Sequence, residues 1–277
     1  MMAVNFRWKL IRTKRLILLL IFSSLHSTIA AQSLAVQDSI AISKPLAVSF
    51  DALGHLYIVT TSGELSKYDQ HLEVLQTYSS PTLNRVSNLD ATQMLKIFAF
   101  YESSQEFQFF DRFLTPSQTA QIKVAPFSHF SVAALSNDQM IWLFDENNLQ
   151  LVKYSPIQED LILKVDLQYF LSERAEIKTL KEYGNRLFLW QDNEILVFDF
   201  LGNLINKFPI EIDHPFQISS NQLYYAIDNK VYFFDLLTST QEKYIIPGVE
   251  DIQFVILIDK NLVVITDQQI KTFLLEL

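Results

Sequence analysis

The sequence has no cysteine and little glycine, and both shortages exclude several kinds of protein. With no cysteine among its 277 residues, the chain forms no disulfide, thiolate metal site, catalytic thiol or lipid-modified N-terminal cysteine. Its five glycines leave little room for a phosphate-binding glycine loop or a dinucleotide fingerprint, and neither motif is present. The Gly-x-Ser-x-Gly of serine hydrolases is missing as well. The chain therefore has none of the short motifs that mark common nucleotide-binding proteins and hydrolases.

Basic residues are too few for a protein that binds nucleic acid. The 22 Lys and Arg residues are outnumbered by 31 Asp and Glu, and the resulting net charge of −9 has the wrong sign for neutralising phosphates. Apolar residues, in contrast, are abundant: 49% of the residues are hydrophobic and 13% are aromatic. This composition excludes intrinsic disorder and supplies a large core. We expect a folded monomer that does not bind nucleic acid.

The first 31 residues differ from the rest and have the order of an export signal. Five basic residues precede an apolar run at Leu16–Phe22, and small residues follow at Ala30 and Ala31. This order predicts a signal peptide over residues 1–31. The alternative is an uncleaved membrane anchor, but the apolar run is much shorter than the roughly 20 residues that span a bilayer. We expect residues 32–277 to form one periplasmic or secreted domain with no membrane span.

A unit of two apolar runs recurs six times along the chain. A run of four apolar or aromatic residues is followed by a polar turn and by a second run that ends in an aromatic residue. The first runs are 56–59, 97–100, 141–144, 187–190, 223–226 and 262–265, and the closing aromatics are Tyr68, Phe110, Tyr154, Phe198, Phe234 and Phe273. The turns are rich in Asn, Asp and Gly, which tolerate the positive φ of tight hairpins. The repeated unit is therefore a β-hairpin.

Strand-like segments also flank the hairpins. They are residues 46–50, 130–135 and 252–257 before a hairpin and residues 74–78 and 204–210 after one. Four strands every ~40 residues make the blade of a β-propeller, so we predict an all-β fold, a six-bladed β-propeller of four-stranded antiparallel blades. The sixth unit lacks an outer strand, and residues 34–42 would fill that place and close the ring. A seven-bladed ring with one unrecognised unit and an array of two-sheet β-sandwiches are the alternatives.

The first unit resembles an NHL repeat. The residues that carry the likeness are Phe50–Val59 and, after the turn, Gly63–Asp69. Residues 194–204 are similar over the second half of the repeat. The resemblance implies a propeller of the NHL or gluconolactonase-like type, and propellers of the latter type bind a divalent ion near the axis. It transfers no functional residue, because the repeat is a folding signature.

An aspartate follows the closing aromatic in four units, at Asp69, Asp111, Asp199 and Asp235. These residues could form a ring of carboxylates or could each open a turn. Because the same position recurs from unit to unit, we interpret them as Asx turns, in which the side chain accepts hydrogen bonds from backbone N–H groups just ahead of it.

A second set of acidic residues lies in the turns between the paired runs, which would all emerge at one end of the ring. Carboxylates that converge there bind Ca²⁺ or Mg²⁺, the cofactors that the resemblance also implies. The candidate metal ligands are Glu102, Asp145, Asp192, Asp228 and Asp267. No spaced calcium-loop motif is present, and acidic residues occur in turns for conformational reasons. The favoured expectation is therefore that no cofactor is bound.

The longest interruption in the repeat separates the third and fourth units. Residues 168–174 predict a short helical turn that carries Tyr169 and Phe170, followed by Glu173 and Arg174. Long loops on a rigid scaffold commonly bind ligands, so these four residues and His214 in a later loop are candidate ligand-binding residues. The alternative is that Tyr169 and Phe170 fill the gap above two blades.

These features favour a binding protein over an enzyme. The four histidines that follow the signal peptide lie far apart in the sequence and lack the spacing of a zinc site; they are His55, His71, His129 and His214. We expect an exported bacterial propeller, a non-enzymatic binding or scaffold module that recognises a protein, peptide or glycan of the cell envelope through loops at one end. The alternative is a metal-dependent hydrolase or lyase of the gluconolactonase-like class.

Overall fold

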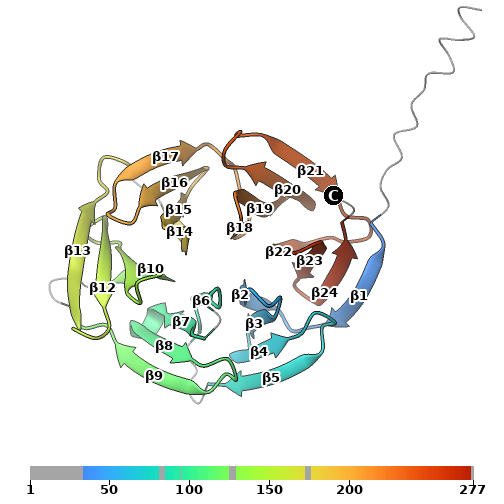
Figure 1. Ribbon diagram of the computed structural model, residues 1–277, viewed down its shortest axis with the longest axis horizontal. Coiled ribbons are helices and arrows are strands. Elements are labelled where there is room, and N and C mark those ends of the chain that lie inside the picture. The colour runs from blue at the N-terminus through green and yellow to red at the C-terminus, as the bar shows by residue number, and fades with distance from the viewer. Residues whose placement is uncertain (1–33, 81–84, 94, 125–128, 172–175, 276–277) are drawn as a thin grey trace, which may run out of the picture. The chain divides into compact units, whose positions relative to one another are not determined.

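The computed structural model describes residues 34–80, 85–93, 95–124, 129–171 and 176–275. Six four-stranded antiparallel sheets are arranged in a ring around a common axis (Figure 1). The prediction of an all-β, six-bladed propeller is confirmed. Within the described ranges the one helical segment is the 3-10 turn η1 (Glu102–Ser104), and no helix is long and apolar enough to cross a membrane.

The first five blades follow the chain from the innermost to the outermost strand. Their strands are β2 (Pro45–Phe50), β3 (Leu56–Thr60), β4 (Glu64–Tyr68) and β5 (Val74–Ser79); β6 (Asn88–Asp90), β7 (Ile97–Tyr101), β8 (Glu106–Phe110) and β9 (Pro116–Gln121); β10 (Phe130–Leu135), β11 (Ile141–Asp145), β12 (Gln150–Ser155) and β13 (Asp160–Asp166); β14 (Ile177–Tyr183), β15 (Arg186–Gln191), β16 (Glu194–Asp199) and β17 (Leu204–Phe208); and β18 (Gln217–Ser219), β19 (Gln222–Ile227), β20 (Lys230–Asp235) and β21 (Gln241–Ile245).

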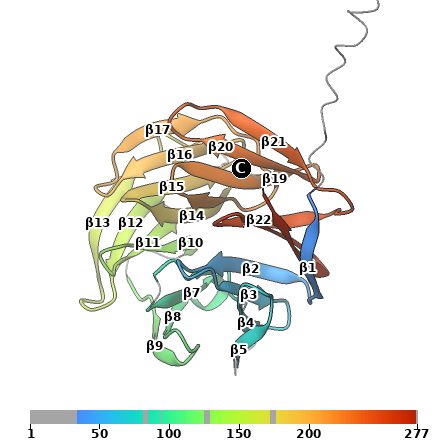
Figure 2. The same cartoon turned by 45° about the vertical axis from the view of Figure 1, so that its right-hand side comes forward.

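The sixth blade combines both ends of the described chain. Its three inner strands are β22 (Ile252–Ile258), β23 (Asn261–Thr266) and β24 (Gln269–Leu274), and its outer strand is β1 (Val36–Ala41). The pairing is antiparallel, with Val36 opposite Phe273 and Ile40 opposite Ile270. In both views β1 lies along the outside of the sixth blade (Figures 1 and 2). The predicted closure by residues 34–42 is therefore confirmed.

The continuous apolar runs form strands because both of their faces are covered by neighbouring blades. Every residue of β3, β7 and β11 is buried. Between the second and third blades, for example, Phe98 and Phe107 share one apolar cluster with Ile141 and Tyr154. The outer strand β13 alternates instead and exposes every second residue. The core is thus a series of layers between adjacent blades.

The antiparallel order of the strands defines two ends of the ring. Connections between blades share one end with the turns between second and third strands, and we call this end the crossover end. It includes residues 61–63, 102–105, 146–149, 192–193, 228–229 and 267–268. The remaining turns lie at the opposite end, the far end. It includes residues 51–55, 69–73, 111–115, 136–140, 156–159, 199–203 and 236–240.

The aspartates after the closing aromatics form turns at the far end. Oδ1 of Asp199 accepts hydrogen bonds from the backbone N–H groups of Leu201 at 2.9 Å and Asn203 at 2.8 Å. Equivalent pairs of bonds occur at Asp69, Asp111 and Asp235. Because the bonds stabilise the ionised carboxylate, they hold the pKa of Asp111, Asp199 and Asp235 below its ordinary value. The prediction of Asx turns is confirmed.

Candidate functional site

A pocket of about 380 Å³ opens at the crossover end, between the second, third and fourth blades. Three carboxylates line it, those of Glu102, Glu146 and Glu176, together with one ammonium group, that of Lys178. Apolar side chains complete the wall; they belong to Val132, Phe144 and Ile177. The pocket therefore combines an excess of negative charge with an apolar surface.

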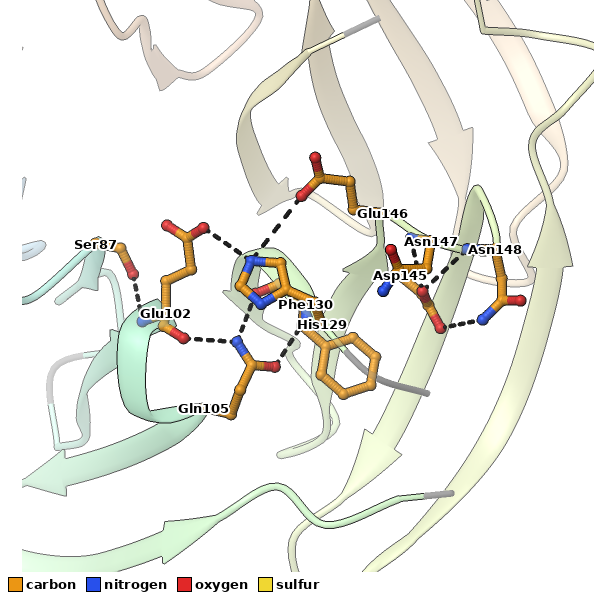
Figure 3. A network of polar contacts seen from close by, with 9 residues as sticks. All are labelled: Ser87, Glu102, Gln105, His129, Phe130, Asp145, Glu146, Asn147 and Asn148. Carbon is orange, nitrogen blue, oxygen red and sulfur yellow. Dashed lines mark hydrogen bonds and ion pairs between the residues drawn. The ribbon is translucent and has the colours of Figure 1, made fainter. Parts of the chain in front are cut away.

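The turn η1 positions Glu102 in this pocket. The backbone N–H of Glu102 donates to Ser87 Oγ at 3.1 Å, and its carbonyl accepts from Gln105 Nε2 at 2.7 Å. Gln105 also exchanges two hydrogen bonds with the backbone of Phe130, at 2.8 and 3.0 Å. The Gln105 side chain thus ties the turn of the second blade to the first residue of the third blade (Figure 3).

His129 lies between two of the carboxylates (Figure 3). Its Nε2 is 3.1 Å from Glu102 Oε1 and 3.9 Å from Glu146 Oε2. Since an ionised carboxylate only accepts hydrogen bonds, Nε2 carries a proton in the shorter contact. The side chains of His129 and Glu102 are 39% and 41% exposed, so a ligand can reach them. Imidazole and carboxylate together can bind a cation or pass a proton.

Lys178 supplies the positive charge of the pocket. Its Nζ lies 5.0 Å from the centre of the Trp190 ring. A cation in this position is attracted to the electron-rich face of the indole. The ring therefore gives the ammonium group a favourable position in the wall of the pocket.

The five predicted metal ligands do not converge. In the described part of the chain, no group of three or more His, Cys, Asp or Glu side chains is placed to hold a metal ion. The buried Asp145 accepts hydrogen bonds from Asn147 and Asn148 at 2.8 to 3.1 Å, and Figure 3 shows its carboxylate directed into this turn. Asp267 forms an ion pair with Lys44 at 2.8 Å. A Ca²⁺ or Mg²⁺ site stays a prediction.

Two of the other predicted ligands occupy tight turns. Asp192 and Asp228 have φ values of 40° and 47°, in the left-handed region that aspartate tolerates better than most residues. Their identity thus has a conformational reason. Glu102 is the member of the predicted set that lines the pocket.

The residues predicted to bind ligand differ in their surroundings. Tyr169 is 90% exposed. Phe170, in contrast, packs against the apolar cluster between the third and fourth blades, and its ring meets the Phe198 ring edge-on with the ring centres 6.3 Å apart. The two residues lie in a hydrogen-bonded turn, in which the backbone N–H groups of Phe170 and Leu171 donate to the carbonyl of Leu167. Glu173 and Arg174 lie outside the described residues. Phe170 therefore fills the gap between blades, and Tyr169 does not.

His214 is half-buried at the connection between the fourth and fifth blades. It precedes Pro215, which lines a cavity of about 80 Å³ near the inner strands. That cavity shares Ser87, Val132 and Lys178 with the pocket at Glu102. His214 itself lines neither of them, and its role in binding stays a prediction.

Serine substitutions at Tyr169 and Phe170 distinguish their two roles. Phe170→Ser removes a partly buried ring, and we expect a loss of about 1–2 kcal/mol, or a melting temperature lower by roughly 3–6 °C. Tyr169→Ser should change the melting temperature by less than about 1 °C, because the ring is exposed. Thermal unfolding followed by circular dichroism measures both. Equal decreases in melting temperature for the two variants would contradict the conclusion that only Phe170 fills the gap between the blades.

The sequence pattern does not predict that His129 meets Glu102 and Glu146. His129 is isolated in the chain, and its neighbours Glu102 and Glu146 belong to turns of different blades. The topology does place them at the same end of the ring. His129 directly precedes the inner strand β10, and Glu102 and Glu146 lie in the turns between the second and third strands of the second and third blades. The exact partners depend on how adjacent blades are aligned.

No protein-family model and no curated protein sequence matches this chain. Solved structures match it by fold. Virginiamycin B lyase from Staphylococcus aureus aligns with a TM-score of 0.62 and 11% identity, over 88% of this chain and 100% of that one. The fold is similar to that of virginiamycin B and streptogramin B lyases.

Two further structures of such lyases agree with the first. A streptogramin B lyase aligns with a TM-score of 0.64 and 10% identity, over 89% of this chain and 99% of the other. A catalytically inactive histidine-to-alanine variant of the Staphylococcus aureus enzyme, crystallised with quinupristin, aligns with a TM-score of 0.60 and 10% identity, over 88% and 100%. At such low identity the likeness concerns the fold, and the resemblance to NHL repeats stays a prediction.

Proposed function

We propose that the protein is an exported, non-enzymatic binding propeller that takes a ligand bearing a positive charge, such as the lysine side chain of an envelope peptide or an amino sugar of a glycan, into the pocket at Glu102. The export signal predicted over residues 1–31 supports the location. The NHL-like first blade supports a relationship to NHL or gluconolactonase-like propellers. The observation that carries the proposal is the chemistry of the pocket, where three carboxylates outnumber one ammonium group.

The pocket suits both parts of such a ligand. An amino group pairs with Glu102 and Glu146, whose carboxylates flank His129, while a methylene chain or sugar ring lies against Val132 and Phe144. Charge pairs at solvent-exposed sites contribute modestly, about 0.2–1 kcal/mol each, so the apolar wall adds needed affinity. The net charge of the full chain is −9 and becomes more negative when residues 1–31, with five basic residues, are removed. This charge attracts cationic ligands from a distance at low ionic strength.

Calorimetric titration with a tri-lysine peptide at low salt tests this function. We expect binding that weakens as ionic strength rises, since exposed charges are screened. The double variant Glu102→Gln/Glu146→Gln should bind about 5–20-fold more weakly, corresponding to the loss of two exposed charge pairs. Glu73→Gln, at the far end, is the matched control and should bind like the unsubstituted protein. Equal affinity of the double variant, or equal binding of a tri-glutamate peptide, would exclude the pocket as a cation site.

A lyase is the second candidate function, and the contact between His129 and Glu102 at 3.1 Å favours it. An elimination needs a base at the proton that is removed, and the structurally similar enzymes are lyases, one of them inactive after loss of a histidine. Conversion of quinupristin by the protein, abolished in His129→Ala, would support this candidate over simple binding. A rise in melting temperature with millimolar Ca²⁺ or Mg²⁺ would instead support a metal-dependent hydrolase or lyase of the gluconolactonase-like class.

A further inference from the structure

A second pocket, of about 260 Å³, lies at the far end of the ring between the first and second blades. Four large apolar side chains form its lip, and all of them are partly exposed to solvent: Leu53, Leu75, Leu95 and Phe113. Leu95 is 77% exposed and Phe113 is 56% exposed. Apolar side chains gathered around one cavity, rather than scattered singly, indicate a ligand-binding site.

The inner wall of this pocket carries a fixed imidazole. Asp51, which is only 4% exposed, accepts four hydrogen bonds: from the backbone N–H groups of Leu53 and His55, from the Tyr57 hydroxyl and from His55 Nδ1, at 2.9 to 3.0 Å. Burial alone would raise the pKa of Asp51, but these hydrogen bonds outweigh it and lower the pKa below its ordinary value. The negative charge of Asp51 is therefore already satisfied by the protein, and the Nδ1 of His55 carries a proton.

Two cationic side chains stand beside this wall. Lys67 is 6% exposed; its Nζ donates to the carbonyl of Arg112 at 3.1 Å and lies 5.4 Å from the centre of the Tyr57 ring. The guanidinium of Arg112 lies 4.6 Å from the centre of the Phe113 ring. Burial lowers the pKa of Lys67, an effect that the charge of Asp51 opposes and that of Arg112 reinforces. A ligand anion between Lys67 and Arg112 would offset the electrostatic cost of burying the Lys67 ammonium and its repulsion by Arg112.

Gln76 adds a polar group that can adapt to a ligand. It lines the same pocket, and its Oε1 is buried with no hydrogen-bond partner among the described residues. A half-turn of the carboxamide presents its NH₂ group instead of the oxygen. The pocket thus offers three donors to an acidic group, from Lys67, Arg112 and Gln76.

We infer that this pocket binds a small monocarboxylate whose acidic group is attached to an apolar ring or branched chain. The carboxylate pairs with Lys67 and Arg112, a geometry in which the planar guanidinium can donate two parallel hydrogen bonds. The apolar part lies among Leu53, Leu95 and Phe113. Because the volume is below the 300 Å³ or so of sites for drug-sized molecules, the ligand is about the size of a single aromatic ring with a short acid chain.

Calorimetric titration with phenylacetate tests this inference directly. We expect a dissociation constant of about 1 mM or tighter, as suits a ligand of this size. Phenylacetamide, which has the same shape without the charge, and phenethylamine, which has the opposite charge, should bind at least about fivefold more weakly if a charge-assisted contact is lost. The inference would be overturned if phenylacetate did not bind at a concentration about tenfold above this dissociation constant, or if phenylacetamide bound equally well.

Substitutions at the rim locate the binding site without disturbing the core. Arg112→Gln and Leu95→Ser remove one exposed contact each, and both should weaken phenylacetate binding by about fivefold or more. Arg186→Gln and Ile157→Ser are matched controls, because these residues are exposed at the far end of other blades. Melting curves confirm that each variant is folded. Unchanged affinity in both rim variants, or equal losses in the controls, would place the binding elsewhere.

Discussion

Deleting residues 34–42 should abolish the cooperative unfolding transition of the propeller. These residues include β1, the outer strand of the sixth blade, which pairs with β24. Ile40 and Ile42 also pack against the apolar cluster that joins the sixth blade to the first. The deletion removes that packing and leaves β24 as an unpaired edge. Because domains of this kind are stable by only about 5–15 kcal/mol, the loss of one strand and of ring closure is comparable to the entire stability.

Circular dichroism melting and binding of a hydrophobic dye measure the outcome. We expect a broad transition without a sharp midpoint and strong dye binding, both of which indicate lost packing. A chain that lacks only residues 1–31 is the control and should unfold in one sharp transition. If the chain that lacks residues 34–42 unfolded sharply, with a melting temperature within about 2 °C of this control, β1 would not be needed to close the ring.

Replacing Trp142 by alanine should cost about 3–5 kcal/mol, the usual range for a fully buried tryptophan. Trp142 is completely buried in β11, and its Nε1 donates to Glu182 Oε2 of β14 at 2.7 Å. The same carboxylate accepts hydrogen bonds from Ser136 Oγ at 2.6 Å and from the backbone N–H of Asn137 at 3.0 Å. Glu182 of the fourth blade thus holds two segments of the third, and loss of the indole opens a cavity beside it.

Urea unfolding of Trp142→Ala and Trp142→Phe separates packing from hydrogen bonding. The phenylalanine variant keeps most of the volume and loses the charge-assisted bond, so we expect a cost of about 1.5–3 kcal/mol. The remaining difference between the two variants reports the cavity. If the alanine variant lost less than 2 kcal/mol or so, the contact between the third and fourth blades would not depend on this residue.

The sequence predicts the two central strands of each blade well, because their apolar runs follow from burial on both faces. It predicts the remaining strands less completely. The inner strands β6 and β18 have three residues each, too few for a pattern. The outer strand β9 has six residues, of which five are exposed, so burial leaves no periodicity in its sequence.

The candidate site was predictable only in part. Acidic turns at a shared end follow from the repeat, but neighbouring residues in one turn have opposite roles: Asp145 is bonded within its own turn, whereas Glu146 faces His129. Which of the two carboxylates reaches the pocket depends on turn geometry. The meeting of Glu102 with His129 depends further on the Gln105 side chain that joins two blades. These are contacts between repeats, which a periodic pattern within each repeat does not encode.

The shared sixth blade also determines when the protein can fold. Val36 pairs with Phe273, so the sixth sheet is assembled from segments that lie far apart in the sequence. Contacts between such distant positions form slowly, since a long loop must be closed before they contribute stability. A growing chain therefore stays open, and accessible to proteases and chaperones, until β24 has been made.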